Sequence, residues 1–401
     1  MSRRASRVPL AWLNLRHDLR RLGVSLAGVG FAVVLMFTEL GFLVALLDST
    51  VAPLDLLDPG AADLVMISQK KGTLTDLQRF PRRWLLAAEA FASVAAARPL
   101  FLEGSSVWHN PATGRSQSIR VLACDTKDPA FRLPDGPRLY GRLEQPGTAL
   151  FDEKSKSSFG YHLLTATPPG NDMEVVLARR TIRVVGTFAM GTDFANDGNV
   201  LVSPRTFEAL FPQRRIADAD VATVDVGLIR LKPQAEPAVV RQALEGALPP
   251  ETYGVRILTL PDLRCKEQSF WLRHTPIGAI FILGMVLGFV VGVVICFQIL
   301  ASEIRDHLGE YATLKAMGYR DPFLWAVIFR QAIWLAIMGF LPGLVFSAAL
   351  YRLLESATGL PLKMQPGWVL VVLLLTLVMC IVSAQLAVRK LFSVDPAELF
   401  R

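Results

Sequence analysis

The sequence has few of the residues that build catalytic and metal sites. It contains five histidines and four cysteines among 401 residues, and the histidines form no pair at metal-ligand spacing. It also has no Gly-x-x-x-x-Gly-Lys-Ser/Thr motif, which excludes a phosphate-binding loop of the Walker type. We therefore expect no catalytic residue, no metal site and no cofactor in this chain.

One loop gathers enough polar side chains to raise the question of a cation site. The segment Gly191–Asn199 carries Asp193, Asn196 and Asp197 in addition to Asn199 itself. Their spacing differs from that of an EF-hand. Turns built from Asx and Gly residues explain the same composition, and we prefer that interpretation.

The four cysteines fall into two pairs. Cys124 and Cys265 lie in a polar part of the chain and could form a disulfide in an oxidising compartment, although spacing alone leaves this open. Cys296 and Cys380 lie inside apolar runs, where we expect them to act as small buried residues.

Long apolar runs are what the sequence has in abundance. A bilayer core about 30 Å thick requires roughly 20 apolar residues in a helix, and four runs reach that length with few charges inside them. They are Gly23–Leu47, Ile277–Leu300, Phe323–Leu350 and Trp368–Val388. The sequence therefore predicts a membrane α-helical fold with four transmembrane helices. A large α/β extracytoplasmic domain, residues 48–275, is inserted between helices 1 and 2.

The distribution of charge predicts the orientation. Residues 1–22 carry six arginines and one aspartate, a net charge of +5 out of +7 for the whole chain. Basic residues gather on the cytoplasmic side of membrane proteins, and the tail 389–401 is also basic. Both termini and the segment 301–321 are therefore expected in the cytoplasm of a bacterial inner-membrane protein, and residues 48–275 in the periplasm. Because topology accounts for the basic charge, no nucleic-acid partner is predicted.

The N-terminal segment has two interpretations. In Trp12–Leu22 apolar residues recur at helical intervals with arginines on the other side, which favours an amphipathic helix on the membrane surface over a solvated basic tail. The apolar run that follows is too long for the core of a cleavable signal peptide, so we expect an uncleaved anchor.

The extracytoplasmic domain has the pattern of a mixed α/β fold. Helices are predicted at Pro81–Ala97 and Glu236–Leu248, and the second of these lies between two predicted strands as a strand–helix–strand unit. A separate lobe is one interpretation of the loop-rich segment Gln145–Pro212. Strands are predicted at Asp63–Ser68, Ser118–Ala123, Thr181–Phe188, Val221–Leu231 and Val255–Leu260.

Two features inside the predicted spans are candidates for function or packing. Glu39 is a carboxylate in the outer half of the first span, where it should face a partner helix, water or the interface, or remain protonated. In the second span Gly284, Gly288 and Gly292 recur at every fourth residue, which permits close helix approach within the chain or across a dimer. Arg330 of the third span can reach the headgroups.

The segment between the second and third spans has the pattern of a docking helix. Apolar residues recur at helical intervals among charges from Ser302 to Tyr319, and Gly318 can end the helix. Such a helix could bind another protein or lie on lipid. The candidate residues are Glu303, Ile304, Leu308, Glu310, Tyr311, Leu314 and Lys315.

Several motifs carry a resemblance to a known family. The strongest are Thr275–Gly278, Val291–Gly292, Gln298–Leu300 and Glu310–Tyr319, and weaker ones are Trp12–Leu15, Leu35–Phe42 and Asp395–Ala397. Together they resemble the DevC branch of the FtsX/MacB-like ABC permeases, the type VII transporters that work by mechanotransmission. The likeness spans essentially the whole chain. Glu39 departs from it, because we expect glutamine there.

The resemblance implies a non-catalytic permease subunit of a tripartite exporter. Its partners would be a separate ABC ATPase that binds ATP and Mg, a periplasmic membrane-fusion protein and a TolC-like outer-membrane channel. The chain would act as a homodimer in contact with membrane lipid, and 301–321 would be the helix that couples it to the ATPase. Glycolipid or another amphiphile is the cargo that the likeness suggests.

Two alternatives remain open at this point. The same architecture could release lipoproteins or extract a lipid from the membrane. An FtsX-like chain could instead regulate periplasmic cell-wall hydrolases without moving a substrate.

Overall fold

The computed structural model describes residues 19–111, 114–159, 173–214, 222–307, 309–310, 313, 317–318, 321–360 and 362–392. The chain divides into two compact units. The membrane unit comprises residues 1–44, 276–354 and 362–401. The other unit comprises residues 45–275 and 355–361, and we call it the extracytoplasmic unit after the location predicted for it.

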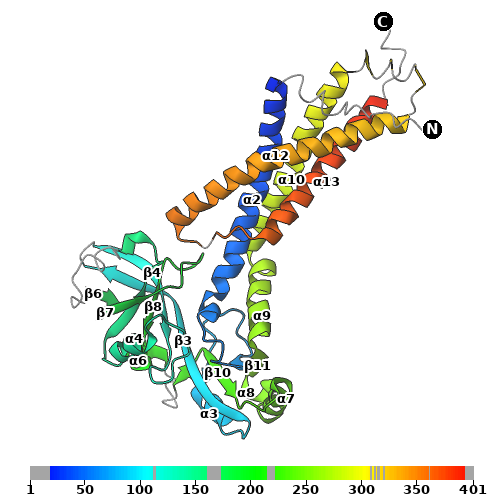
Figure 1. The fold of residues 1–401 in the computed structure, drawn as a ribbon. Helices are drawn as coiled ribbons and strands as arrows, with labels where there is room; N and C mark the ends of the chain where they lie inside the picture. Colours follow the sequence, from blue (N-terminus) through cyan, green and yellow to red (C-terminus); the bar gives the residue numbers. More distant parts are fainter. Residues whose placement is uncertain are drawn as a thin grey trace. The chain divides into compact units, whose positions relative to one another are not determined.

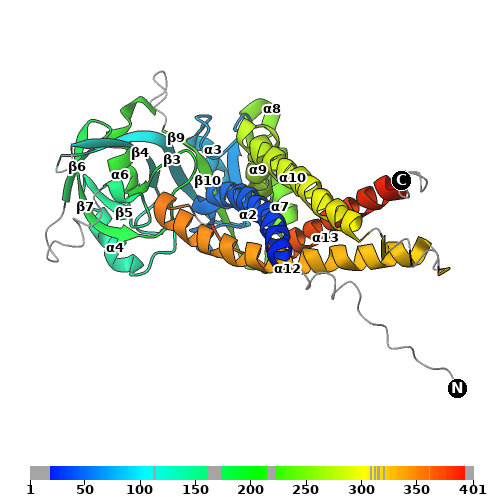
Figure 2. The same ribbon diagram turned by 90° about the horizontal axis from the view of Figure 1, so that it is seen from above.

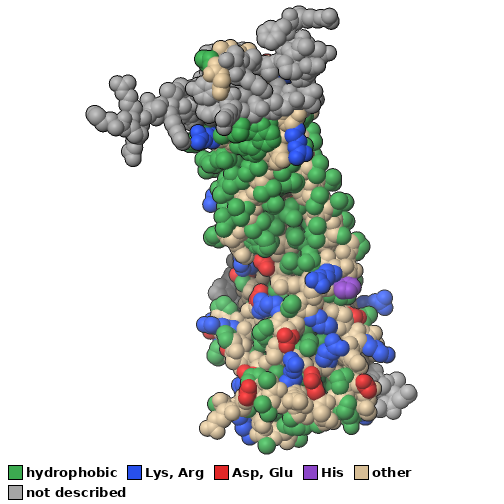
Figure 3. Space-filling model, turned by 90° about the vertical axis from the view of Figure 1, so that its right-hand side faces the viewer, with side chains coloured by type: hydrophobic (Ala, Val, Ile, Leu, Met, Phe, Trp, Pro, Cys, Tyr) green, Lys and Arg blue, Asp and Glu red, His purple; other side chains and the backbone are tan. Residues whose placement is uncertain are grey.

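Four long helices carry the predicted spans. They are α2 (Leu19–Asp55), α10 (Pro276–Asp306), α12 (Asp321–Thr358) and α13 (Pro366–Phe392). In the part of the chain that the structure describes, these four are long and apolar enough to cross a membrane. Figure 3 shows that one face of the helices is an almost continuous hydrophobic surface, whereas Lys, Arg, Asp and Glu are scattered over the face of the extracytoplasmic unit.

Two of these helices are longer than a bilayer requires. At 1.5 Å per residue, the 37 residues of α2 and the 38 of α12 extend well beyond the roughly 20 that cross a bilayer core. Residues 45–55 of α2 and 355–358 of α12 belong to the extracytoplasmic unit. These two helices are therefore common to both units.

The second predicted span ends at Leu300, and α10 continues beyond it without a break to Asp306. No proline or glycine follows Gly292 within this helix, so nothing in the sequence stops it at the end of the apolar run. Glu303 and Ile304 therefore belong to α10. Of the predicted N-terminal amphipathic helix, Leu19 onward forms the start of α2, and residues 12–18 lie outside the described residues.

A nine-stranded sheet forms the centre of the extracytoplasmic unit, in the order β11-β1-β10-β3-β4-β8-β5-β7-β6. Its longest strand is β3, which pairs with β10 through Val94–Leu100 and with β4 through Phe101–Asn110. In Figures 1 and 2 it is the long cyan strand that runs through both halves of the sheet. The bounds are β1 (Leu64–Ser68), β3 (Val94–Asn110), β4 (Arg115–Ala123), β5 (Thr148–Asp152), β6 (Met173–Leu177), β7 (Arg180–Phe188), β8 (Asn199–Val202), β10 (Val226–Leu231) and β11 (Val255–Thr259).

Short elements surround this sheet. Strands β2 (Phe80–Pro81) and β9 (Thr223–Val224) form a separate two-stranded pair. Helix α9 begins directly after β11 because Thr259 and Asp262 form a reciprocal capping box. The helices are α3 (Arg82–Glu89), α4 (Gly136–Leu143), α6 (Pro204–Leu210), α7 (Pro237–Ala247), α8 (Pro250–Tyr253) and α9 (Leu260–Arg273), with 3₁₀ turns η1 (Ser157–Phe159) and η2 (Pro212–Arg214).

Both faces of the sheet are buried. Side chains alternate across a strand, and in β1 Leu64 and Met66 pack into one hydrophobic cluster while Val65 and Ile67 pack into the other. Such strands appear in a sequence as unbroken apolar runs, which is why several of them could be predicted.

The predicted strands are found, with one interruption. Val221–Leu231 is divided into β9 and β10 by Asp225, and residue 221 lies outside the described residues. The helix predicted at Glu236–Leu248 is confirmed as α7. The strands before and after it, β10 and β11, do not pair with each other, because β1 lies between them antiparallel to both.

Two predictions about this unit are wrong. The helix predicted over Pro81–Ala97 ends at Glu89, and Val94–Ala97 starts β3, where Ala97 pairs with Ile229. Sheet pairing overrides the helix propensity of the alanines. The segment Gln145–Pro212 is not a separate lobe, because its described strands complete the same sheet.

The cysteines of this unit are not paired. Cys124 is buried and Cys265 is exposed, and both are free thiols. The disulfide considered from the sequence is therefore absent from this structure.

Candidate functional site

The predicted docking segment is only partly described. Leu308, Tyr311, Leu314 and Lys315 lie outside the described residues. Glu310 is exposed, and its Oε1 lies 3.2 Å from Nδ1 of His307.

The first two candidates of that segment lie at the end of α10. Ile304 is buried, and Glu303 accepts a hydrogen bond from Nε2 of Gln331 on α12. Within this chain the Glu303 side chain therefore links α10 to α12. Contact of these two residues with an ATPase stays a prediction.

The glycines of α10 lie at close helix contacts within the chain. A Cβ added at Gly288 would be 3.4 Å from Cβ of Leu35 on α2. One added at Gly292 would be 2.8 Å from Cβ of Ala32 and would collide with the sulfur of Met379 on α13. These positions let three helices approach one another where larger side chains would separate them.

Glu39 faces the third of these glycines. A Cβ at Gly284 would lie 2.5 Å from the carboxyl carbon of Glu39. One turn away, the rings of Phe42 on α2 and Phe281 on α10 stack with centroids 5.8 Å apart. The carboxylate is therefore placed against the partner helix α10, in space left free by a missing side chain.

A second glycine contact was missed in the sequence. A Cβ at Gly339 of α12 would lie 2.7 Å from Cβ of Val29, and one at Gly343 would lie 2.9 Å from Cβ of Val33. On the α2 side, a Cβ at Gly30 would be 3.4 Å from the carbonyl oxygen of Gly339. The four-residue spacing of Gly339 and Gly343 is the signal that could have predicted this crossing.

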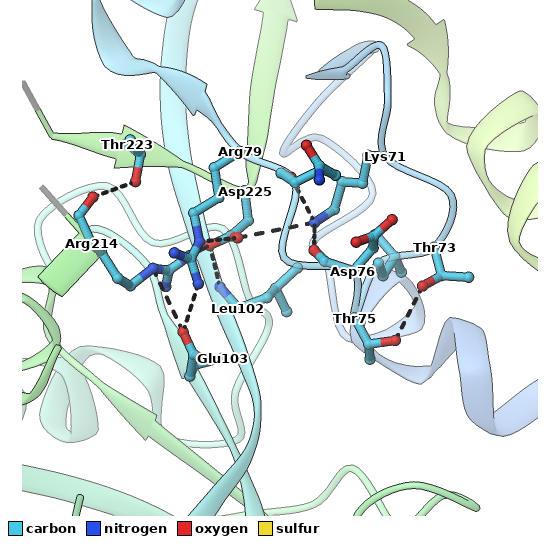
Figure 4. Close-up of polar contacts among 12 residues, drawn as sticks. Lys71, Thr73, Thr75, Asp76, Arg79, Leu102, Glu103, Arg214, Thr223 and Asp225 are labelled. Atoms are coloured by element: carbon cyan, nitrogen blue, oxygen red, sulfur yellow. Dashed lines mark hydrogen bonds and ion pairs between the residues drawn. The ribbon is translucent and has the colours of Figure 1, made fainter. Parts of the chain in front are cut away.

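The extracytoplasmic unit contains a buried cluster of charges at the point where β3 changes partners (Figure 4). Asp225, which separates β9 from β10, accepts a hydrogen bond from the backbone N–H of Leu102, 2.9 Å away. Its carboxylate pairs with Arg214, with Arg79 at 3.4 Å and with Lys71 at 4.0 Å. One buried carboxylate thus faces three cations.

Glu103 supplies the second carboxylate of this cluster. Its Oε2 lies 3.0 Å from Nη2 of Arg79 and 3.6 Å from Nε of Arg214. Burial raises the pKa of Glu103 and lowers those of Lys71 and Arg214, and the opposite charges partly offset both shifts. This arrangement fixes the strands rather than activating a nucleophile, because each charged group is held by another.

The polar loop after β7 is built from the turns that we preferred. Oδ1 of Asp193 accepts hydrogen bonds from the backbone N–H of Ala195 at 2.8 Å and of Asn196 at 2.6 Å. Its Oδ2 forms an ion pair with Arg120, a buried residue of β4 whose pKa burial lowers to about 10. Among the described residues, no group of His, Cys, Asp and Glu could hold a metal ion.

Open space for a ligand is limited in the described part of the unit. A surface groove of about 530 Å³ is lined by Val107, His109, Arg179, Phe211 and neighbouring residues. The cavity beside Arg214 holds about 20 Å³, which is room for a water molecule. Neither has the combination of reactive groups that a catalytic site needs.

Comparisons with known proteins concern both units. Residues 281–396 match the family model of the FtsX-like permease C-terminal region. No curated protein sequence matches the chain. A solved structure of the periplasmic region of MacB from Actinobacillus actinomycetemcomitans is 11% identical, with a TM-score of 0.35, and the match covers 51% of this chain and 92% of that one.

A second solved structure is also similar. It is the extracellular domain of the noncanonic ABC-type transporter YknZ from Gram-positive bacteria, 8% identical with a TM-score of 0.32, and the match covers 49% of this chain and 99% of that one. The family match and the four apolar helices support a multi-pass membrane protein. The C-terminal membrane region of this chain is thus similar to that of the FtsX-like permeases.

Proposed function

We propose that this chain is the permease subunit of a tripartite ABC exporter of the DevC type. The match of residues 281–396 to FtsX-like permeases is the observation that carries the proposal. The ATP and Mg would be bound by a separate ATPase, and the chain would pass the motion of that ATPase to its extracytoplasmic unit. A periplasmic membrane-fusion protein and a TolC-like outer-membrane channel would complete the assembly.

The helices support a mechanical role. No proline follows Pro276 in α10, and the one proline within α2, Pro53, lies in its last turn. A helix with no proline in its middle keeps its backbone hydrogen bonds there and bends little, so displacement of one end reaches the other. Because α2 and α12 supply residues to both units, movement of the membrane helices would act directly on the extracytoplasmic unit.

The ATPase would dock on the segment 301–321. Leu308 and Tyr311 would fill an apolar groove on the ATPase, with Leu314 beside them. Glu310 and Lys315 would supply complementary charges at the rim, where charge steers association. The described end of α10, held by Glu303 and Gln331, would carry the movement into the bundle.

One face of α10 would be covered by a second copy of the chain. In the most apolar stretch of α10, 17% of the residues are buried inside the chain, compared with 61% in that of α2. The spacing of its exposed apolar residues spreads them over about half of the helix surface. These residues are Ile280, Ile282, Leu283, Val286, Leu287, Val290, Val291 and Val294. A homodimer would bury them, and lipid would cover what remains.

The cargo would be an amphiphile such as a glycolipid. The exposed apolar surface of the helices gives a lipid-soluble molecule access to the chain from the bilayer. The small cavities beside Arg214 and beside Thr50 hold about 10 to 20 Å³, which is too little for such a molecule. The cargo would therefore be moved by the assembly rather than held inside this chain.

Purification of the tagged chain from native membranes after mild cross-linking tests the proposal. We expect an ABC ATPase and a membrane-fusion protein to copurify, and ATP hydrolysis to depend on that ATPase. Leu308→Ala combined with Tyr311→Ala should remove side chains each worth about 2 kcal/mol or more at a binding hot spot, and should lower stimulated hydrolysis. Leu353→Ala, an exposed apolar position at the other end of α12, is the matched control.

Two results would contradict the proposal. Copurification of a cell-wall hydrolase without an adaptor or channel would favour the regulatory alternative. Normal ATPase binding by the double alanine variant would show that the segment 301–321 lies on lipid.

A further inference from the structure

A short loop of the extracytoplasmic unit lies against the ends of three helices. This junction loop, residues 190–198, connects β7 to β8. Its Asp193 lines a small cavity together with Thr50 near the end of α2 and Trp271 of α9. Its Thr192 Oγ1 lies 3.5 Å from the carbonyl oxygen of Thr358, the last residue of α12.

Each of these three helices leads to the membrane unit. Helices α2 and α12 are continuous with it, and α9 is followed by α10 after two residues, His274 and Thr275. Thr275 Oγ1 donates a hydrogen bond to the carbonyl oxygen of Trp271 at 2.5 Å, which ties this short connection back to α9. The junction loop therefore contacts the end of α12 and shares a small cavity with α2 and α9, the helices by which motion could enter the sheet.

Gly359, directly after α12, lies close to the junction loop. Gly359 has φ of +74°, a conformation that favours glycine. A Cβ there would lie 3.1 Å from Oγ1 of Thr192 and 3.5 Å from the carbonyl oxygen of Lys154. A larger residue would be strained and would displace α12 from the loop.

The junction loop is a rigid block because a second buried carboxylate holds its two ends together. Oδ1 of Asp152 accepts the backbone N–H of Met190 at 2.9 Å. Its Oδ2 accepts the backbone N–H of Gly191 at 2.9 Å and Nδ2 of Asn199 at 2.8 Å. Asp152 is fully buried at the end of β5, so the loop is fixed to the sheet at its base.

The ion pair between Arg120 and Asp193 fixes the middle of the loop to β4. Arg120 is 3% exposed, and its backbone N–H donates to the carbonyl oxygen of Gly198 at 2.9 Å. In the register of β4 and β8 it lies opposite Asn199. A buried pair of this kind is costly to break, because the partner that remains is charged and desolvated.

We propose that the junction loop transmits displacement of the three helices to the nine-stranded sheet, with Arg120 and Asp193 as the positioning residues that join the loop to β4. This inference rests on the proposed function, since it assigns a route to the motion that the ATPase would drive. The loop receives motion at Thr192 and at the cavity beside Thr50 and Trp271, and it passes the motion to β4.

The test compares ATP hydrolysis with movement of the sheet in the purified complex. A spin label at Lys127→Cys, in a Cys265→Ser background, reports the distance between the two protomers with and without ATP. We expect the complex carrying Asp193→Asn to hydrolyse ATP like the parent complex while losing the ATP-driven change in that distance. Thr192→Val keeps every charge and removes only the hydrogen bond to Thr358. It should also weaken the ATP-driven change in distance, and it remains a test of the proposal if Asp193→Asn does not fold.

The matched control is Asp197→Asn in the same loop. Asp197 pairs with Lys156 at 2.5 Å, but both side chains are exposed, so the change in distance should be that of the parent. If both Asp193→Asn and Thr192→Val keep the full change, the junction loop does not transmit motion. If the parent complex hydrolyses ATP without any change in distance, the proposed function is contradicted instead.

Discussion

Different kinds of contact stabilise the inside of each of the two units. In the membrane unit, α2 meets α10 and α12, and α10 meets α13, at glycines and other small residues. In the extracytoplasmic unit, buried ion pairs hold the points where strands and loops change partners. Lipid offers helices no hydrophobic gain from association, so close packing replaces it, whereas a water-exposed domain can bury apolar faces and use charges for position.

From this comparison we expect the largest losses of stability from substitutions in the buried ion pairs of the extracytoplasmic unit, which we call its charged joints. Asp225→Ala would remove the carboxylate that Arg79, Arg214 and Lys71 share and leave Glu103 as the only acid of the cluster. Breaking a buried ion pair in this way costs about 3–5 kcal/mol of folding stability. We expect a large fall in the thermal midpoint of the purified chain in detergent. Asp225→Asn should fall less, because it can still accept from Leu102. An unchanged midpoint for Asp225→Ala would show that the cluster is not a joint.

The glycine contacts of the membrane unit come next in size. Gly292→Leu would force α10 away from Ala32 and Met379, and overpacking of this kind costs about 1–3 kcal/mol. Membrane abundance and the thermal midpoint should both decrease. Gly23→Leu is the control, since nothing lies within 4 Å of a Cβ at that position. Equal behaviour of the two variants would contradict close packing at Gly292.

Glu267 gives a pH-dependent effect of intermediate size. Its Oε2 accepts from the backbone N–H of Leu74 at 2.7 Å and its Oε1 from Nε1 of Trp271 at 2.9 Å, yet burial raises its pKa. A carboxyl whose folded-state pKa is raised takes up a proton on folding, so its ionisation lowers stability as pH rises through that pKa.

Glu267→Gln removes this ionisation. The variant loses one accepting oxygen and so has a constant deficit, but its thermal midpoint relative to the parent should improve as pH rises through the folded-state pKa of Glu267. The measurement is the thermal midpoint of the variant and of the parent at a series of pH values from acid to neutral. A difference that does not vary with pH would mean that Glu267 titrates alike in the folded and unfolded chain.

Exposed ion pairs should have the smallest effect. Arg241 lies 3.9 Å from Glu245 and 3.3 Å from Asp262, and all three side chains are more than a third exposed. Arg241→Ala should cost at most about 1 kcal/mol, and salt should reduce the effect further. A loss as large as that of Asp225→Ala would remove the distinction between buried and exposed charges.

The sequence predicted the elements whose signal is local. Apolar runs identify the four long helices. Strand β1 appears as a short apolar run because it is buried on both faces, and β7 appears as a segment rich in Val, Ile and Thr. The spacing of Gly284, Gly288 and Gly292 predicted a close helix contact, although it could not say which helix would fill it. The alanines at the start of β3 favoured a helix, and only their pairing with β10 makes them part of a strand.

The charged joints could not be predicted for a different reason. Arg120 and Asp193 are far apart in the sequence and lie in segments with no shared pattern, and the same holds for Arg79 and Asp225. Their proximity follows from the order of strands in the sheet, which no local periodicity contains. The hydrogen bond from Gln331 to Glu303 likewise joins two helices that no local pattern places side by side.

The most direct test of the account is hydrogen–deuterium exchange of the complex with its ATPase, with and without trapped ATP. The account predicts that ATP on the cytoplasmic side alters exchange in peptides of the extracytoplasmic unit, above all in the junction loop and in β4. Changes confined to the ATPase and to the segment 301–321, with residues 45–275 unaffected, would contradict transmission of motion across the membrane.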